Sequence, residues 1–120
     1  MSKSFDPIDY LTLCDSLIGT CNNNQSVIRT IIGRAYYASF LKTREWLKSH
    51  GVIFSKTHED HEKVKETLRQ KYQYLTGIGD KFGKLQRQRI KADYEIEAFF
   101  IRTDAVESIE IAKEIAKNIH

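Results

Sequence analysis

The sequence predicts an all-α protein, an up-and-down bundle of four to five helices that forms a single domain over residues 1–120. The chain has one proline and six glycines, which is too little punctuation for many short strands. Its apolar residues recur at spacings of three and four, the period of one helix face. At 120 residues the chain can bury a core without disulfide or metal cross-links.

The first helix is predicted to begin at Asp6-Pro7 and to end near Gly19. An aspartate can accept hydrogen bonds from the free amides of a first turn, and proline is favoured at the first helical position. The apolar stripe of this helix is Ile8, Leu11, Cys14 and Ile18.

A second, longer helix is predicted from Val27 to about Ser49. The polar run 21–25 before it is typical of a loop, Ser26 is a suitable N-cap, and Gly51 is a suitable stop. Its apolar stripe is Ile28, Ile31, Ile32, Ala35, Ser39 and Trp46.

The third and fourth helices are predicted from their start signals. Thr57 and Asp60 approximate a capping box, which predicts the start of the third helix. Residues 76–79 are expected to break this helix, and Asp80 to cap a fourth helix rich in basic residues. The stripe of the third helix is His61, Val64, Leu68, Tyr72 and Leu75.

Residues 95–102 are open to two interpretations, because they could continue the fourth helix or form an extended packed connection. Thr103 is then the predicted N-cap of the last helix. The stripe of that helix is Ala105, Ile109, Ala112, Ala116 and Ile119.

The composition is that of an ordinary soluble protein, with 41% hydrophobic residues, 29% charged residues and a net charge of +3. Cys14 and Cys21 are too few for a disulfide framework, and nothing resembles a signal peptide or a membrane span. We therefore expect a cytoplasmic protein without a membrane partner. His58 and His61 lie three residues apart with no evident third ligand, so we expect no metal and no cofactor.

The stretch 81–94 is the most unusual part of the chain, since it carries five cations before its first acid, Asp93. In a helix, Arg89 shares the apolar stripe with Phe82 and Leu85. A guanidinium on such a face is costly unless it meets an anion or a hydrogen-bonding group, which indicates a functional role for Arg89. The alternative is a plain solvated face, which explains the lysines of this stretch but leaves Arg89 unexplained.

A second anomaly is the pair Tyr36 and Tyr37, which point to different faces of one helix. Either both rings fill the core and their hydroxyls reach polar partners, or Arg34 and one tyrosine belong to the same polar site as Arg89.

Two motifs, RTIIGRAYYASF at 29–40 and LQRQRIKADY at 85–94, resemble the HEPN domain, the higher eukaryote and prokaryote nucleotide-binding family. Residues 103–119 also resemble the last helix of that family, so the resemblance covers nearly the whole chain. It implies an all-α up-and-down bundle that is usually dimeric. The family includes RNA-cleaving toxins, phage-defence effectors and small proteins encoded beside a minimal nucleotidyltransferase.

The resemblance also implies a catalytic motif, an arginine followed four to six residues later by histidine. Two such motifs meet across the dimer and form a metal-independent ribonuclease site. The arginine matches Arg89, but Tyr94 stands where the histidine would be expected. A phenol, with an ordinary pKa of about 10, is a poorer base than an imidazole. This departure favours a non-catalytic function.

We therefore expect a dimeric RNA- or nucleotide-binding, or partner-binding, module of a toxin–antitoxin or phage-defence system, with a degenerate ribonuclease motif. The expected partners are a second copy of the chain, RNA or a nucleotide, and a minimal nucleotidyltransferase or another defence protein. The alternative is an active ribonuclease toxin, in which Arg89 stabilises the phosphorane and Asp93 or Tyr94 handles protons. The expected nucleic-acid contacts are Lys84, Arg87, Lys91, Arg34 and Tyr37.

Overall fold

The computed structural model describes residues 4–119, and within that range it contains five helices and no strand. The all-α prediction is confirmed. No helix formed by these residues combines the length and the apolar character that a membrane crossing requires. The helices are α1 (Asp9–Ile18), α2 (Gln25–Ser49), α3 (Glu59–Lys71), α4 (Ile78–Tyr94) and α5 (Arg102–Asn118).

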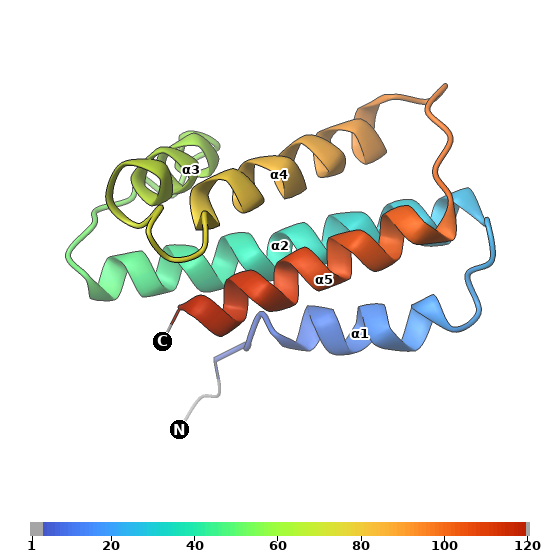
Figure 1. Cartoon of the computed structure of the whole chain (residues 1–120), viewed down its shortest axis with the longest axis horizontal. Helices are drawn as coiled ribbons and strands as arrows, with labels where there is room; N and C mark the ends of the chain where they lie inside the picture. The colour runs from blue at the N-terminus through green and yellow to red at the C-terminus, as the bar shows by residue number, and fades with distance from the viewer. Residues whose placement is uncertain (1–3, 120) are drawn as a thin grey trace.

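Helix α2 is the centre of the bundle, because it packs against each of the other four helices. Figure 1 shows α1 and α4 on opposite sides of the pair α2 and α5, and running opposite to that pair. Helix α3 is seen nearly end-on in the same view, so it crosses the others beside the start of α4. Four helices are thus up-and-down, and the fifth lies across them.

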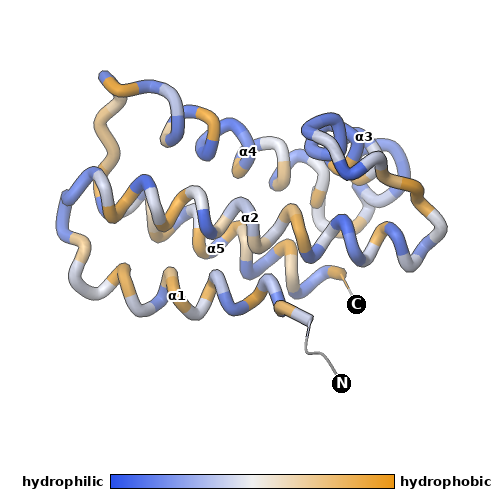
Figure 2. Tube along the Cα trace, turned by 180° about the vertical axis from the view of Figure 1, so that it is seen from behind, coloured by the Kyte–Doolittle hydropathy of each residue, from blue (hydrophilic) through white to orange (hydrophobic). Residues whose placement is uncertain are grey.

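The core follows the predicted stripes. Figure 2 shows hydrophobic and hydrophilic residues alternating along α2, α4 and α5, as expected of helices with one buried face. On α4, Phe82, Leu85 and Ala92 are buried, which is the stripe predicted around Arg89. The largest fully buried side chains include Tyr36, Phe82, Ile28, Ile31, Ile32, Leu47, Leu68 and Ile115.

The first residues of α2 and α5 differ from the prediction. Helix α2 begins at Gln25 because the Asn24 side chain accepts a hydrogen bond from the Val27 amide at 3.2 Å, so Ser26 is not the cap. Helix α5 begins at Arg102, one residue before the predicted cap Thr103. There the Asp104 carboxylate accepts the Ile101 amide at 2.8 Å.

The predicted caps of the other helices are also revised. Asp6 accepts the Ile8 amide at 3.0 Å as expected, but the α-helix proper begins only at Asp9, after a turn. The carboxylate of Asp60 accepts the amides of Ser55 and Lys56, both at 2.9 Å, and does not form a capping box with Thr57.

Helix α4 begins earlier than predicted, at Ile78. Gly77 is its N-cap and has a left-handed backbone with φ 71°, a conformation that glycine adopts without strain. Asp80 lies in the first turn, where its carboxylate accepts a hydrogen bond from the Gln73 amide group at 2.7 Å. The break between α3 and α4 therefore covers residues 72–77 and includes Gly77, whereas Gly79 lies in the first turn of α4.

Residues 95–101, here called the connector, are an extended packed connection between α4 and α5, which settles the two interpretations left open above. The Arg29 guanidinium donates to the carbonyls of Ala92 at 2.8 Å and Ala98 at 2.6 Å, and also lies over the Phe100 ring. The Gln25 side chain donates to the Phe100 carbonyl at 2.7 Å and accepts the Phe100 amide at 3.0 Å. These bonds hold the last turn of α4 against α2.

Candidate nucleic-acid interface

Arg89 lies on the inner side of α4 with 17% of its side chain exposed. Its Nη2 donates a hydrogen bond to the Tyr37 hydroxyl at 3.0 Å, and its Nε lies 2.8 Å from Oδ2 of Asp93. Nε is buried and has no hydrogen bond within residues 4–119, so Asp93 balances the charge without satisfying this donor. Arg89 is thus held at the edge of a polar site.

Three tyrosine rings surround the Arg89 guanidinium. Its Cζ lies 5.2 Å from the ring centroid of Tyr37, 5.6 Å from that of Tyr36 and 6.0 Å from that of Tyr94. These distances are within the range of cation–π attraction. Tyr36 is fully buried, whereas Tyr37 is half-buried and Tyr94 is exposed. Of the two adjacent tyrosines, Tyr36 therefore fills the core and Tyr37 lines the polar site.

His61 of α3 lies in the same cluster. Its Nδ1 is 2.5 Å from the Tyr36 hydroxyl, and its ring stacks on Phe40 with centroids 3.9 Å apart. Burial, followed by the positive charge of Arg89, lowers the pKa of His61 below its ordinary value. The imidazole is therefore uncharged at neutral pH.

The sequence placed His61 on the core stripe of the third helix and suggested a metal ligand beside His58 only as a rejected possibility, but it did not indicate that His61 lies next to Arg89. A signal was present, because His61, Val64 and Leu68 share one stripe of the third helix. In the structure Val64 and Leu68 are buried, and this stripe faces the core. His61 and Arg89 both lie on stripes that face the core, so their side chains can come close together.

Arg34 and Arg29 lie on the same face of α2 but differ in their partners. Arg34 has no ion pair and no hydrogen bond within residues 4–119, and its guanidinium lies 5.0 Å from the Tyr10 ring and 5.4 Å from the Tyr37 ring. Arg29 instead donates to four backbone carbonyls at the end of α4 and in the connector. Of these two arginines, Arg34 is therefore the one whose N–H donors make no hydrogen bond within residues 4–119.

The other basic residues of α4 lie on its outer face. Lys84, Arg87 and Lys91 are spaced three and four apart and are exposed, on the side opposite Arg89. Lys84 forms an ion pair with Glu107 of α5, and the Lys91 ammonium lies 5.9 Å from the Phe100 ring. The structure brings together Arg34, Tyr37, Arg89, Asp93 and Tyr94, but not these three cations.

No protein-family model, curated protein or solved structure matches this chain. Its own residues indicate the chemistry of the cluster. Two guanidinium groups contact the Tyr37 ring, and one of them is paired with the Asp93 carboxylate. The uncharged imidazole of His61 contacts Tyr36 and Tyr37 from α3. Among residues 4–119, no three His, Cys, Asp or Glu side chains come together in a way that could hold a metal ion.

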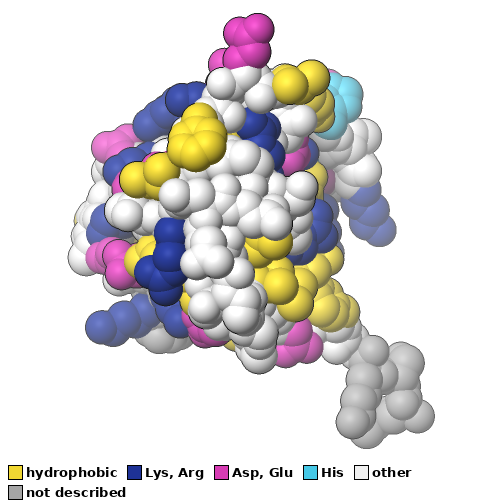
Figure 3. Space-filling model, turned by 90° about the vertical axis from the view of Figure 1, so that its right-hand side faces the viewer, with side chains coloured by type: hydrophobic (Ala, Val, Ile, Leu, Met, Phe, Trp, Pro, Cys, Tyr) yellow, Lys and Arg dark blue, Asp and Glu magenta, His cyan; other side chains and the backbone are white. Residues whose placement is uncertain are grey.

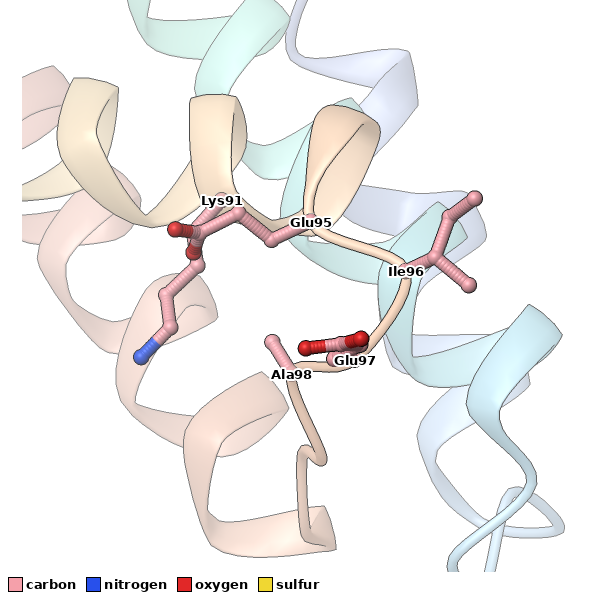
Figure 4. A pocket seen from close by; sticks show the side chains of 5 residues that line it. All are labelled: Lys91, Glu95, Ile96, Glu97 and Ala98. Carbon is pink, nitrogen blue, oxygen red and sulfur yellow. The ribbon is translucent and has the colours of Figure 1, made fainter.

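A separate hollow of about 440 Å³ lies between the last turn of α4 and the connector. Figure 4 shows Lys91 and Glu97 extending into the space below α4, while Ile96 points away from it. The lining includes one lysine and two glutamates, Glu95 and Glu97, so its charge does not favour a polyanion. Two guanidinium groups lie together instead at the Tyr37 ring, those of Arg34 and Arg89.

Proposed function

We propose that this chain is an RNA- or nucleotide-binding helical module of the HEPN type. One observation carries the proposal: Arg34 and Arg89 both place a guanidinium against the Tyr37 ring, at 5.4 and 5.2 Å from its centroid. Within residues 4–119, Asp93 is the one carboxylate that forms an ion pair with either of them. The site therefore has an excess of positive charge.

The chemistry of this excess suits phosphate. Guanidinium groups offer planar, forked donors that match the oxygens of a phosphate, and they remain charged at any physiological pH. The half-buried Tyr37 ring orients both groups, so less conformational entropy is lost when they bind. Arginines in this setting support the binding of a nucleic-acid backbone more strongly than the exposed lysines of the outer face do.

Fluorescence anisotropy of a labelled single-stranded RNA, measured over a series of salt concentrations, tests the proposal. Arg34→Ala and Arg89→Ala should each weaken binding and reduce the slope of log K against log salt by about 0.7, the value for one lost contact with single-stranded nucleic acid. Lys113→Ala is the control, because Lys113 of α5 is paired with Asp15 of α1, whereas the two arginines lie on α2 and α4. Absence of salt-dependent binding to RNA or nucleotides would reject the proposal.

The proposed module is a homodimer joined through the outer face of α4 and the connector. Charges of both signs surround the apolar residues: Arg87 and Lys91 on α4, and Glu95 and Glu97 on the connector. Across a twofold axis, the cations of one copy can meet the acids of the other. Figure 3 shows hydrophobic side chains among basic and acidic ones at this end of the molecule. The exposed apolar residues are Ile90, Tyr94, Ile96, Phe99 and Ile101.

Light scattering tests the dimer. The double change Ile96→Glu with Phe99→Glu should give a monomer, because it places charge at two of the most exposed apolar positions of this surface. Ile53→Glu is the control, since Ile53 is 81% exposed and lies outside this surface. A wild-type monomer at high protein concentration would reject the dimer and leave RNA binding to be judged separately.

The HEPN resemblance supports placing this module in a toxin–antitoxin or phage-defence system. Its protein partner would then be a minimal nucleotidyltransferase or another defence protein. Co-purification of the untagged product of a neighbouring gene with the tagged chain tests this part of the proposal.

A second candidate function, a metal-independent ribonuclease, is favoured by the place of His61. An uncharged imidazole can accept the proton of a ribose 2′-hydroxyl, and Arg89 beside it can stabilise the developing negative charge. Cleavage of single-stranded RNA in EDTA should then disappear in both His61→Ala and Arg89→Ala. If cleavage is absent from the wild-type protein, or persists in both variants, the module is not a ribonuclease of this kind.

A further inference from the structure

A small hollow of about 200 Å³ lies between α2 and the last turn of α4. Four of its residues lie on one face of α2, at spacings that bring them together, and the fifth is Asp93 of α4. The hollow is smaller than the range of about 300–1,000 Å³ typical of pockets for drug-sized ligands, so it suits a fragment the size of a sugar and a phosphate. Its lining is Arg29, Thr30, Gly33, Arg34 and Asp93.

Arg34 provides the available cation of this hollow. Its guanidinium contacts the rings of Tyr10 and Tyr37, and it makes no hydrogen bond or ion pair with residues 4–119. Arg29 adds positive charge but donates to the carbonyls of Ala92, Glu95, Ile96 and Ala98. An anion that enters the hollow would therefore take its hydrogen bonds from Arg34.

Asp93 provides an acceptor in the same hollow. Its Oδ2 faces Arg89, whereas its Oδ1 lies 3.9 Å from the point where a Cβ on Gly33 would stand. Oδ1 has no hydrogen-bond partner among the described residues, and a carboxylate oxygen can only accept. Since Gly33 has no side chain, a donor on a ligand can approach Oδ1 from the hollow.

Arg34 and Asp93 together determine which ligand the hollow can bind. A ligand with only an anionic group would satisfy Arg34 but would bring a second negative charge beside Asp93. A ligand with an anionic group and a neighbouring hydroxyl donor would satisfy both. In a nucleic acid, the phosphodiester and the ribose 2′-hydroxyl are such a pair, and deoxyribose lacks the donor.

We propose that this hollow binds one sugar–phosphate unit of single-stranded RNA, with Arg34 donating to the phosphodiester and Asp93 accepting from the ribose 2′-hydroxyl. The inference rests on the proposed function and adds to it a preference for ribose over deoxyribose. Arg89 balances the charge of Asp93, so the carboxylate can remain beside a phosphate.

The test compares the affinity of the purified 120-residue chain for three matched single-stranded oligonucleotides: RNA, DNA and 2′-O-methyl RNA. The wild-type protein should bind RNA about tenfold more tightly than either of the others, the loss expected for one hydrogen bond to a charged group. The 2′-O-methyl strand keeps the ribose and its 2′ oxygen but carries a methyl group in place of the hydroxyl hydrogen, so it cannot donate. It therefore separates recognition of the hydroxyl from recognition of strand shape.

Two variants test whether the preference for RNA over DNA arises in this hollow. Asp93→Ala should abolish the preference for RNA while DNA binding is kept or improved, because an acid beside the phosphate is removed. Asp15→Ala is its control, since it deletes an exposed acid of α1 that is paired with Lys113, and it should leave the preference unchanged. Gly33→Ala should lower RNA affinity toward that of DNA, because its methyl group occupies the approach to Oδ1.

Gly19→Ala is the control for the second variant, because a Cβ at Gly19 meets nothing within 4 Å. Equal affinity of the wild-type protein for RNA and DNA would overturn the proposed recognition of the ribose 2′-hydroxyl and leave phosphate binding intact. An RNA preference that survives both Asp93→Ala and Gly33→Ala would also overturn it. Failure to bind any of the three strands would reject the proposed function itself.

Discussion

The hydroxyl of Tyr36 lies 2.5 Å from Nδ1 of His61, and this hydrogen bond joins α2 to α3 beside Arg89. Tyr36 is fully buried, so its hydroxyl would be unpaired without His61. The two rings are also nearly parallel, with centroids 5.7 Å apart. Tyr36 and His61 therefore belong both to the hydrophobic core and to the candidate site.

Stability should decrease in mild acid because of His61. Burial, followed by the charge of Arg89, lowers the pKa of its imidazole in the folded state. The stability that this group contributes is fully present above its unfolded pKa, near 6.5, and is lost as the pH falls through the lower folded pKa. Urea denaturation at several pH values should show this loss in the wild-type protein and in His50→Gln. His61→Phe should show a flatter profile between pH 7 and 5; an unchanged profile would remove His61 as the cause.

A double-mutant cycle should show that Tyr36 and His61 are energetically coupled. Tyr36→Phe and His61→Phe each leave a polar group without its partner, which should cost about 1–3 kcal/mol in the free energy of unfolding. The double variant replaces both partners by apolar rings, so its loss should be smaller than the sum of the two single losses. Strictly additive losses, measured by urea denaturation, would contradict the hydrogen bond.

Alanine should be costly at Gly79 of α4 and less costly at Gly83. A Cβ on Gly79 would stand 2.7 Å from the backbone nitrogen of Arg69, and one on Gly83 would stand 2.8 Å from the end of the Arg69 side chain. Gly79→Ala should therefore destabilise the protein by about 1–3 kcal/mol, and Gly83→Ala by less, because a flexible side chain can move. Thermal denaturation measures both.

Gly33→Ala is the opposite case within α2. Its Cβ would meet only Asp93 Oδ1, at an ordinary contact distance of 3.9 Å. Alanine should therefore stabilise the helix by about 0.5–1 kcal/mol. Destabilisation by Gly33→Ala similar to that of Gly79→Ala would contradict the 3.9 Å separation between this Cβ position and Asp93 Oδ1.

Arg29→Ala should loosen the connector. The guanidinium bonds four carbonyls at the end of α4 and in the connector, and methyl cannot replace any of these bonds. Amide hydrogen exchange should become faster in residues 95–101, and stability should fall by about 1–3 kcal/mol. Arg44→Ala, which removes an arginine of α2 that bonds none of these carbonyls, should leave exchange in the connector unchanged.

Cys14 should resist alkylation in the folded protein. Burial, followed by the charge of Asp15, raises the pKa of the thiol from 9.0 to about 11, and only the thiolate reacts. In a Cys21→Ser background, iodoacetamide at pH 8 should modify Cys14 only after urea is added, as measured by mass spectrometry. Rapid modification without urea would contradict the buried position.

The helical stripes could be predicted because the helix period is a local property of the sequence. Phe82, Leu85 and Ala92 are buried as expected, and this placed Arg89 on the inner face of α4. The first residues of the helices were harder to predict, because several polar residues compete for the same free amides. Asn24 rather than Ser26 caps α2 because its side chain reaches the Val27 amide, a matter of backbone direction that the pattern does not contain.

The part of the candidate site that could not be predicted comes from α3. The sequence placed His61 on a core stripe, but the stripe does not tell which helix it meets. That depends on how α3 crosses the bundle, which follows from packing among all the helices (Figure 1). Its neighbours Tyr36 and Phe40 are known only from the structure.

The Gln25 side chain pairs with both polar groups of the Phe100 backbone, as a neighbouring strand would. The two residues are 75 positions apart in the chain. Closing so long a loop is entropically costly, so helices with nearby contacts form before it. During synthesis, the start of α2 leaves the ribosome well before Phe100 exists, so the Gln25 side chain can make this pair only after the connector has been made.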